Sequence, residues 1–379
     1  MATKKALFIS DENEFNSKIE GGVQICSQEY YNLLESSGFD LITFYISISR
    51  KLIYRILRKI NLDVYNLYCP DDYIEKIVRI IKNNNITWIF LNKSELIRFA
   101  KAIKIKCGHS VNIVVLSHGN ETSDYLHELT RTSDAQNIFQ LFIGIIRLGL
   151  NLYLESLLRI NYINNVVTMS EVEQNIEKWL GISDPIYIPR IIKIENVCWT
   201  PENNNVGFIG TLDHIPNRLG LQMIFEELRL REIENIKINL IGSRKSTGQY
   251  FSEKYKFVRY LGMLSANEAL EEMKKWSFIL NPVFWFARGA STKLAKIIGW
   301  GIPPITTIAG TRGYRWSDGN LLITQNSVED FVDKLVWNLK NPGSAEFWRE
   351  QTILVSQSSS SIKELGRQFV QQLYLVKEG

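Results

Sequence analysis

The chain has 379 residues, which is enough for two domains of ordinary size. Its 45% hydrophobic and 22% charged residues are typical of a globular protein, and a net charge of +4 is too small to indicate a nucleic-acid partner. Four scattered cysteines show no CxxC or other metal-binding spacing, so we interpret them as reduced thiols, which favours the cytosol. The apolar run in "MATKKALFIS" is too short for a secretory signal.

Short apolar runs alternate with helical patterns throughout the first half of the chain. The predicted strands are "KALFIS", "DLITFYI", "ITWIFLN", "VNIVVLSHG" and "NNVVTMS". Helices are predicted over 23–37, from residue 50, and over 71–82, 94–106 and 136–159. The last of these is apolar but contains Arg147, and we predict that it does not span a membrane.

The second half repeats this alternation. The predicted strands are "NNVGFIGTL", "IKINLIGS", "FVRYLGML", "SFILNPV" and "PPITT", and the predicted helices cover 216–230, 266–275 and the segment after "FWFARGAS". Strands separated by helices indicate βαβ units and parallel sheets, so the fold class is α/β with two doubly wound domains. The boundary should fall in "SDPIYIPRIIKIENVCWTPENNN". Ligands of such sheets bind at the carboxyl ends of strands, and we expect a cleft between the two domains.

Two loops of the first half are candidates for ligand contact. Gly21 and Gly22 open a helix after the first strand, where glycines let the backbone approach a phosphate or a sugar. His118 follows a buried strand and could bind a sugar hydroxyl or polarise a leaving group. The alternatives are an ordinary turn for the glycine pair and a histidine bound by local backbone.

The loops of the second half add glycines and cations. Gly210 and Thr211 end a strand, and Arg218 lies in the first turn of the following helix. Gly242 and Ser243 end the next strand, where a nucleotide base could rest. For Arg218, the alternative is an arginine that faces solvent.

The segment "FWFARGASTKLAKIIGWGIPPITT" combines a helix start with several cations. Ser291 or Thr292 is a suitable N-cap, and Gly301 followed by prolines should end the helix. Arg288, Lys293 and Lys296 place positive charge where the helix dipole disfavours it, so we predict an anion site that fits a diphosphate. The alternative is an exposed helix start with no ligand.

A basic amphipathic pattern covers "SISRKLIYRILRKINL". Its cations lie opposite its apolar residues, as in helices that bind an anionic membrane surface, although an ordinary packed helix has the same pattern. The aromatic-rich helix 136–159 could add to that surface.

The second half resembles the retaining group 1 (family 4) glycosyltransferases of the GT-B fold. The matching phrases are "VGFIGTLDHIPNRLGL", "INLIGS", "VRYLGML", "FILNPVFWFARGASTKLAKIIGWGIPPITT", "AGTRGY" and "SVEDFVDKL". The first half matches more weakly, through "GGVQICSQEYYNLLESSGF", "LSHG" and "VVTMSEVEQNIEKWLG". The resemblance implies two Rossmann-like domains, 1–188 for the acceptor and 189–355 for the donor, with the helix in 356–379 returning to the first domain.

The resemblance also implies a metal-independent transfer of a sugar, with retention, from a nucleotide-sugar co-substrate and without a further cofactor. In that scheme His118, Arg218 and Lys293 take part in catalysis. The donor diphosphate would contact a larger set of residues: Gly21, Gly22, Gly210, Thr211, Arg288, Ser291, Thr292 and Lys296. The base and the ribose of the donor would contact Gly242, Ser243, Leu261 and Gly262.

One departure from the family is a reversal of charge. The family's Glu-x7-Glu signature corresponds here to Arg288 and Lys296, and a lysine cannot accept hydrogen bonds from a ribose. Three interpretations follow: other groups hold the ribose, the donor is unusual, or catalysis is lost and the chain serves as a glycan-binding or partner subunit.

We therefore predict a cytoplasmic glycosyltransferase, peripheral at the inner membrane face, that acts on a glycan or lipid-linked acceptor in cell-surface polysaccharide synthesis. The alternative is the impaired GT-B-like subunit. A third class is a sugar-nucleotide epimerase or a phosphorylase. The sequence offers no lysine in a cofactor-like setting, and the chain is short for a phosphorylase.

Overall fold

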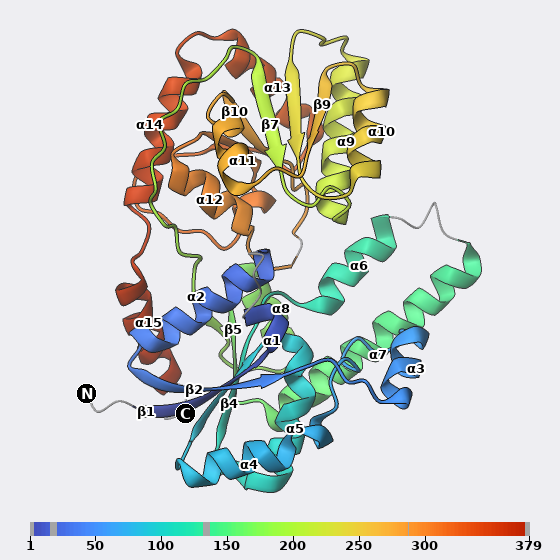
Figure 1. Cartoon of the computed structure of the whole chain (residues 1–379), viewed down its shortest axis with the longest axis vertical. Helices are drawn as coiled ribbons and strands as arrows, with labels where there is room; N and C mark the ends of the chain where they lie inside the picture. Colours follow the sequence, from blue (N-terminus) through green and yellow to red (C-terminus); the bar gives the residue numbers. More distant parts are fainter. Residues whose placement is uncertain (1–3, 16–20, 132–136, 287, 376–379) are drawn as a thin grey trace. The chain divides into compact units, whose positions relative to one another are not determined.

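A computed structural model describes the chain except residues 1–3, 16–20, 132–136, 287 and 376–379. The chain divides into two compact units, Met1–Pro189 with Ser361–Gly379 (unit 1) and Arg190–Ser360 (unit 2). Each unit contains one sheet of six parallel strands connected by helices (Figure 1). The predicted α/β class with two parallel-sheet domains is confirmed.

The sheet of unit 1 has the order β2-β1-β3-β4-β5-β6. Its strands are β1 (Lys4–Asp11), β2 (Phe39–Ile46), β3 (Trp88–Asn92), β4 (Asn112–Leu116), β5 (Asn165–Thr168) and β6 (Ile186–Tyr187). All five residues of β3 are buried, as expected for a central parallel strand covered on both faces. The strand order reverses between β1 and β3, so the loops after these strands diverge and leave room for a ligand there.

Nine α-helices of the described residues belong to unit 1. They are α1 (Glu12–Phe15), α2 (Gly22–Ser36), α3 (Leu52–Ile60), α4 (Ile74–Asn83), α5 (Ile97–Cys107), α6 (Glu121–Arg131), α7 (Ile138–Tyr162), α8 (Glu171–Trp179) and α15 (Ile362–Leu375). The sequence analysis did not predict α6, because this polar helix buries little more than Thr122 and Leu129. For α7, the predicted first residue, Gln136, lies outside the described residues.

The last helix lies in unit 1 although it follows unit 2 in the chain. The side chains of Ser36 and Ser37 at the end of α2 donate hydrogen bonds to the carbonyls of Ile362 and Gly366 in α15. A Cβ on Gly366 would lie 2.6 Å from Ser36 Oγ, so a glycine allows the two helices to pack this closely.

The sheet of unit 2 has the order β12-β11-β10-β7-β8-β9. Its strands are β7 (Asn205–Ile209), β8 (Lys237–Ile241), β9 (Val258–Gly262), β10 (Phe278–Asn281), β11 (Pro304–Thr307) and β12 (Leu322–Thr324). Counted from its own first strand, this is the 3-2-1-4-5-6 order of dinucleotide-binding sheets, and it reverses between β7 and β10. The carboxyl ends of β7 and β10 are therefore the expected ligand position within unit 2.

The α-helices of unit 2 are α9 (Ile215–Leu230), α10 (Lys245–Lys254), α11 (Ala266–Met273), α12 (Thr292–Trp300), α13 (Val328–Lys340) and α14 (Ser344–Gln357). No helix was predicted over the segment of α10, whose glycine and polar residues disfavour a helix. The glycine is needed for packing, since a Cβ on Gly248 would lie 2.3 Å from the ring of Tyr260 on β9. Tertiary contact therefore overrides local propensity here.

Candidate functional site

The segment between β10 and β11 forms the helix that its local signals predict. Ser291 is the N-cap of α12 and its hydroxyl accepts a hydrogen bond from the amide of Leu294, 3.4 Å away. Gly301 adopts the left-handed conformation, with φ of 67°, and ends the helix. Leu294 and Ile298 are buried, which fixes the face that α12 turns to the core. The predicted helix, its N-cap and its glycine stop are confirmed.

The loop that precedes α12 is anchored through its carbonyl groups. Arg190 donates to the carbonyl of Ala290 at 3.0 Å, and Arg312 donates to the carbonyl of Arg288 at 3.0 Å. The hydroxyl of Tyr314 donates to the carbonyl of Ser291. These three hydrogen bonds fix the carbonyls of Arg288, Ala290 and Ser291 at the amino end of α12, where free amides favour an anion.

The sequence offered no signal that Arg190, Arg312 and Tyr314 position this loop. Their partners lie 100, 24 and 23 positions away along the chain. The phrase "AGTRGY", noted only as part of the resemblance, contains two of them.

Lys293, in the first turn of α12, is half-buried. Its Nζ lies 4.0 Å from the centroid of the Phe208 ring on β7 and donates to Oδ1 of Asn217 at 3.4 Å. Among the described residues, no carboxylate forms an ion pair with it, and burial lowers its pKa to about 7. A lysine with this pKa is only partly charged at neutral pH, and a nearby anion would raise its pKa.

Asn217 and Arg218 lie in the first turn of α9, directly after β7. Asn217 donates to the carbonyl of Thr211 at 2.9 Å, so it connects the β7 loop to Lys293. The Nε of Arg218 is buried and has no hydrogen-bond partner within the described ranges. The hydrogen bond from Lys293 to Asn217 thus joins the first turns of α9 and α12 at the switch point between β7 and β10.

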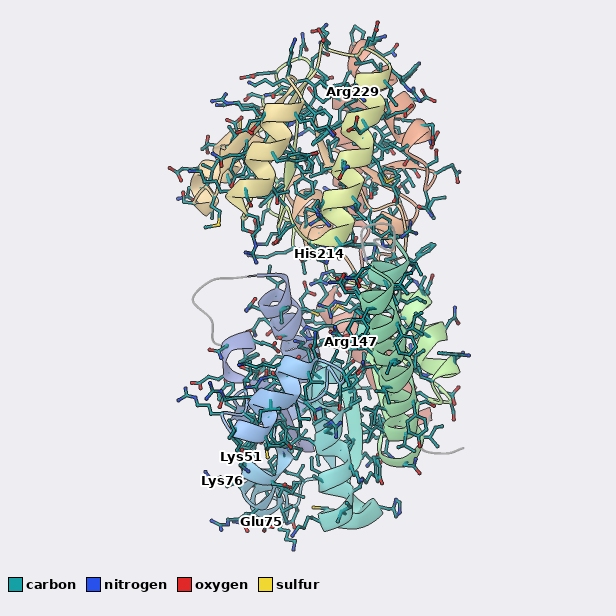
Figure 2. The ribbon with its side chains drawn as sticks, turned by 90° about the vertical axis from the view of Figure 1, so that its right-hand side faces the viewer. Lys51, Glu75, Lys76, Arg147, His214 and Arg229 are labelled. Atoms are coloured by element: carbon teal, nitrogen blue, oxygen red, sulfur yellow. The ribbon has the colours of Figure 1, made fainter. Side chains whose placement is uncertain are left out.

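The position of α9 depends on one glycine. A Cβ on Gly220 would lie 2.0 Å from the carbonyl oxygen of Pro282, which directly follows β10. Only a glycine permits this approach, and it seats the start of α9, marked by His214 in Figure 2, against the end of β10. Pro216 is the second residue of α9 rather than the predicted first, because the helix begins at Ile215.

The two residues at the signature positions differ in their surroundings. Arg288 is half-buried in the anchored loop. Lys296 is exposed, and its charge helps to lower the pKa of Glu195, after the larger effect of the hydrogen bond from Lys193. Of the cations that we predicted to share the anion site, Lys293 meets the start of α9, whereas Lys296 faces solvent near Glu195.

The predicted base and ribose residues lie at the ends of β8 and β9. A Cβ on Gly242 would lie 1.8 Å from the carbonyl oxygen of Gly210, so the ends of β7 and β8 touch through backbone. Leu261 and Gly262 line an open cavity of about 760 Å³ between β9 and α10. Ser243 is half-buried and Thr211 is exposed at the same edge of the sheet.

His118, after β4 in unit 1, is held by a buried network. Its Nε2 lies 2.9 Å from Oδ1 of Asn92, whose amide donates to the hydroxyls of Ser10 and Ser27. Because the amide nitrogen is used twice, the oxygen of Asn92 accepts and Nε2 of His118 donates. The ring of His118, which follows β4, is therefore held at the carboxyl edge of the first sheet through Asn92 on β3, which is itself bound to residues of β1 and α2.

Gly21 and Gly22 begin α2 within the same unit. Gly21 is the N-cap, and its amide donates to the side chain of Gln24 at 3.1 Å. Gly22 is exposed and is the first residue of the helix.

A buried charge cluster at the β1/β3 switch point was not predicted. Lys93 follows β3 with φ of 99°, and its Nζ lies 2.7 Å from Glu14 and 2.6 Å from Glu95. Burial is the largest influence on the pKa of Glu14 and raises it above the ordinary value. The sequence signal was available, since Lys93 directly follows a strand end. Among the described residues, no three His, Cys, Asp or Glu side chains gather as metal ligands would.

No protein-family model and no curated protein matches the sequence. Solved structures match nearly the whole chain, among them the following three. Sucrose-phosphate synthase from Thermosynechococcus elongatus has a TM-score of 0.65 at 12% identity and covers 99% of each chain. The lipopolysaccharide outer core galactosyltransferase WaaB has a TM-score of 0.63 at 14% identity, covering 98% of this chain and 99% of that one. Anabaena HepE in complex with UDP-glucose has a TM-score of 0.61 at 12% identity, covering 98% and 99%.

The chain has the GT-B fold. These matches cover both units. The likeness therefore includes the sheet of each unit and the order of the two units along the chain. At such low identity the likeness establishes the fold alone. The chemistry of this GT-B chain has to be argued from its own residues.

Proposed function

We propose that the chain is a retaining glycosyltransferase that moves a sugar from a nucleotide-diphosphate donor to a glycan or lipid-linked acceptor, in cell-surface polysaccharide synthesis. The observation that carries the proposal is a pair of cations, Arg218 and Lys293, that form no ion pair among the described residues and lie at two helix starts joined at the GT-B switch point. One of the GT-B neighbours supports it, because Anabaena HepE has been solved in complex with UDP and glucose and with UDP-glucose.

The proposed donor site uses the amino end of α12. The diphosphate would accept hydrogen bonds from the first-turn amides, the Thr292 hydroxyl and Lys293, with Arg218 supplying a second positive charge. Gly210 and Thr211 would lie beside it, and Arg288 would approach from the anchored loop. Lys293 would become fully charged on binding, because the anion offsets the burial that lowers its pKa to about 7.

In the transfer step, the bond between the anomeric carbon and the phosphate oxygen breaks while the acceptor oxygen bonds to that carbon from the same face. The acceptor's proton goes to the departing diphosphate. Arg218 and Lys293 stabilise the negative charge that develops on the leaving group. His118 orients the sugar through its fixed ring, and no metal is required by this scheme.

The nucleoside end of the donor would follow the edges of β8 and β9. Gly242 and Ser243 would contact the ribose, and the base would enter the cavity lined by Leu261 and Gly262. This arrangement leaves the ribose without the family's carboxylate, because Lys296 occupies that position.

One observation favours a second candidate function. Arg288 and Lys296 reverse the charge of both signature acids, so the chain could bind a donor or a glycan without turning it over. In that case it would act as a glycan-binding or partner subunit.

Calorimetry with UDP, GDP and other nucleoside diphosphates tests the donor site on the full chain. We expect one of them to bind, and Lys293→Met to weaken that affinity by at least about tenfold. Lys340→Met, an exposed lysine at the end of α13, is the matched control. Absence of binding by every nucleotide would refute the transferase.

Incubation with the corresponding nucleotide sugar separates the two functions. Release of the nucleoside diphosphate, dependent on Lys293, supports the transferase. Binding without any turnover, with water or with added acceptors, favours the non-catalytic subunit.

A further inference from the structure

The helix α7 is attached to unit 1 by its polar residues and turns its apolar residues outward. Its buried residues are Gly144, Asn151, Glu155, Leu158 and Arg159. Three of the five are polar or charged, and they share one face because they are four residues apart. An ordinary surface helix buries its apolar face, so the pattern of α7 is inverted.

The buried face of α7 is fully engaged within unit 1. Glu155 accepts hydrogen bonds from the hydroxyl of Tyr65 and from the amide of Asn120, the latter at 3.0 Å. Arg159 forms a bidentate ion pair with Glu177, at 2.5 and 2.8 Å. Because these charges are neutralised inside the unit, α7 is held against it over the carboxyl half of its length.

The opposite face of α7 carries large apolar side chains in solvent. Ile138, Phe139 and Phe142 are 88%, 70% and 60% exposed, and Tyr153 and Ile160 are each 64% exposed. The single acidic residue of α7 is the buried Glu155, so this face has no negative charge. A continuous apolar stripe of this length is a surface for an apolar partner.

The basic helix α3 lies beside α7 on the same side of unit 1. The side chain of Asn151 on α7 bonds the carbonyl of Leu62 at 3.0 Å and the amide of Val64 at 3.1 Å, just after α3 ends. Figure 2 looks onto this side, with Lys51 at the start of α3 and Arg147 on α7.

All residues of α3 are at least partly exposed. Leu52 and Ile53 are 70% and 55% exposed, and Arg55 and Lys59 are exposed beside them on the same helix. A basic helix with an apolar stripe, beside a second apolar helix, combines the two features that bind an anionic lipid surface.

We propose that α3 and the outer face of α7 together form a membrane-docking face that takes an anionic lipid bilayer. Both helices would lie in the plane of the interface, with apolar side chains among the acyl chains and the cations of α3 at the headgroups. By length and composition α7 could cross a membrane, but its buried ion pair and hydrogen bonds hold it to unit 1 instead.

The charges disfavour a second copy of the chain as the occupant. Two such faces would bring the cations of one α3 against those of the other, and neither α3 nor the outer face of α7 offers a carboxylate to pair with them. Anionic lipid headgroups, by contrast, would pair with the cations of α3 and would need no carboxylate from either helix. This inference rests on no part of the proposed function.

Flotation of the full chain with lipid vesicles tests the docking face. We expect it to float with vesicles of phosphatidylcholine mixed with phosphatidylglycerol, to stay behind with phosphatidylcholine alone, and to bind less as salt rises. The triple variant Ile138→Ser, Phe139→Ser, Phe142→Ser should lower the bound fraction by at least about tenfold. Arg55→Glu with Lys59→Glu should lower it by about tenfold.

The matched control is Leu230→Ser with Trp337→Ser, which removes exposed apolar side chains from unit 2 and should leave flotation unchanged. Thermal melting and nucleotide binding of the triple variant should match the wild type, which separates loss of docking from misfolding and from failure of the donor site. Wild-type protein that does not float, or a triple variant that floats as well, would overturn the proposal. So would a wild-type dimer that the triple variant dissociates in the absence of lipid binding.

Discussion

Replacing Lys293 with methionine should stabilise unit 2 and weaken its affinity for a diphosphate. Burial lowers the pKa of this lysine from 10.5 to about 7, and at about 1.36 kcal/mol for each unit of pKa this corresponds to a cost of about 5 kcal/mol. The side chain is only half-buried, so we scale the cost to about 3 kcal/mol. Loss of the contact with the Phe208 ring removes about 1 kcal/mol, which leaves a net gain of about 2 kcal/mol at pH 6.

The gain should depend on pH in a defined direction. Between pH 7 and 10.5 the unfolded chain binds more protons at this lysine than the native protein does, so wild-type stability rises with pH across that window. Below pH 7 the free-energy cost of burying the charged Lys293 is present in full. The advantage of Lys293→Met should therefore be largest at pH 6 and clearly smaller at pH 9.

Urea unfolding followed by tryptophan fluorescence measures this effect, because seven of the nine tryptophans lie in unit 2. Lys340→Met, at an exposed position in the same unit, should change stability by less than about 0.5 kcal/mol at either pH. A Lys293→Met variant that is no more stable at pH 6, or whose advantage is the same at pH 9, would show that this lysine is not strained by burial. Stabilisation without loss of nucleotide affinity would remove Lys293 from the donor site.

Three further predictions concern the framework of the two units. Gly220→Ala should destabilise unit 2 by more than about 2 kcal/mol in urea unfolding, because the added Cβ would clash with the carbonyl of Pro282. Gly149→Ala should be neutral or stabilising, because a Cβ there would lie within 4 Å of no other atom. Glu177→Gln should cost unit 1 about 3–5 kcal/mol, because it leaves a buried arginine without its ion pair; a loss below about 1 kcal/mol in thermal unfolding would contradict the burial. Tyr314→Phe should cost about 1 kcal/mol of stability and lower nucleotide affinity severalfold in calorimetry, and an unchanged affinity would show that the loop does not position the donor.

Local signals determined the elements and the loops of this protein. Parallel strands are apolar runs between helical patterns, and the ends of α12 follow from a serine N-cap and a glycine that tolerates a left-handed backbone. The candidate site could be placed because strand ends gather at one edge of a parallel sheet. The helix α10 was missed because its glycine is required by a contact with β9 that the sequence does not reveal.

Tertiary structure decided which side chains face inward. Lys293 and Lys296 are three residues apart with the same chemistry, yet one is half-buried against Phe208 and the other is exposed, because the packing of α12 on the core sets its rotation. The same holds for α7, whose apolar sequence does not by itself show which of its faces is buried. Its polar stripe is buried, because Glu155 and its neighbours find hydrogen-bonding partners from distant segments, and such partners exist only in the folded chain.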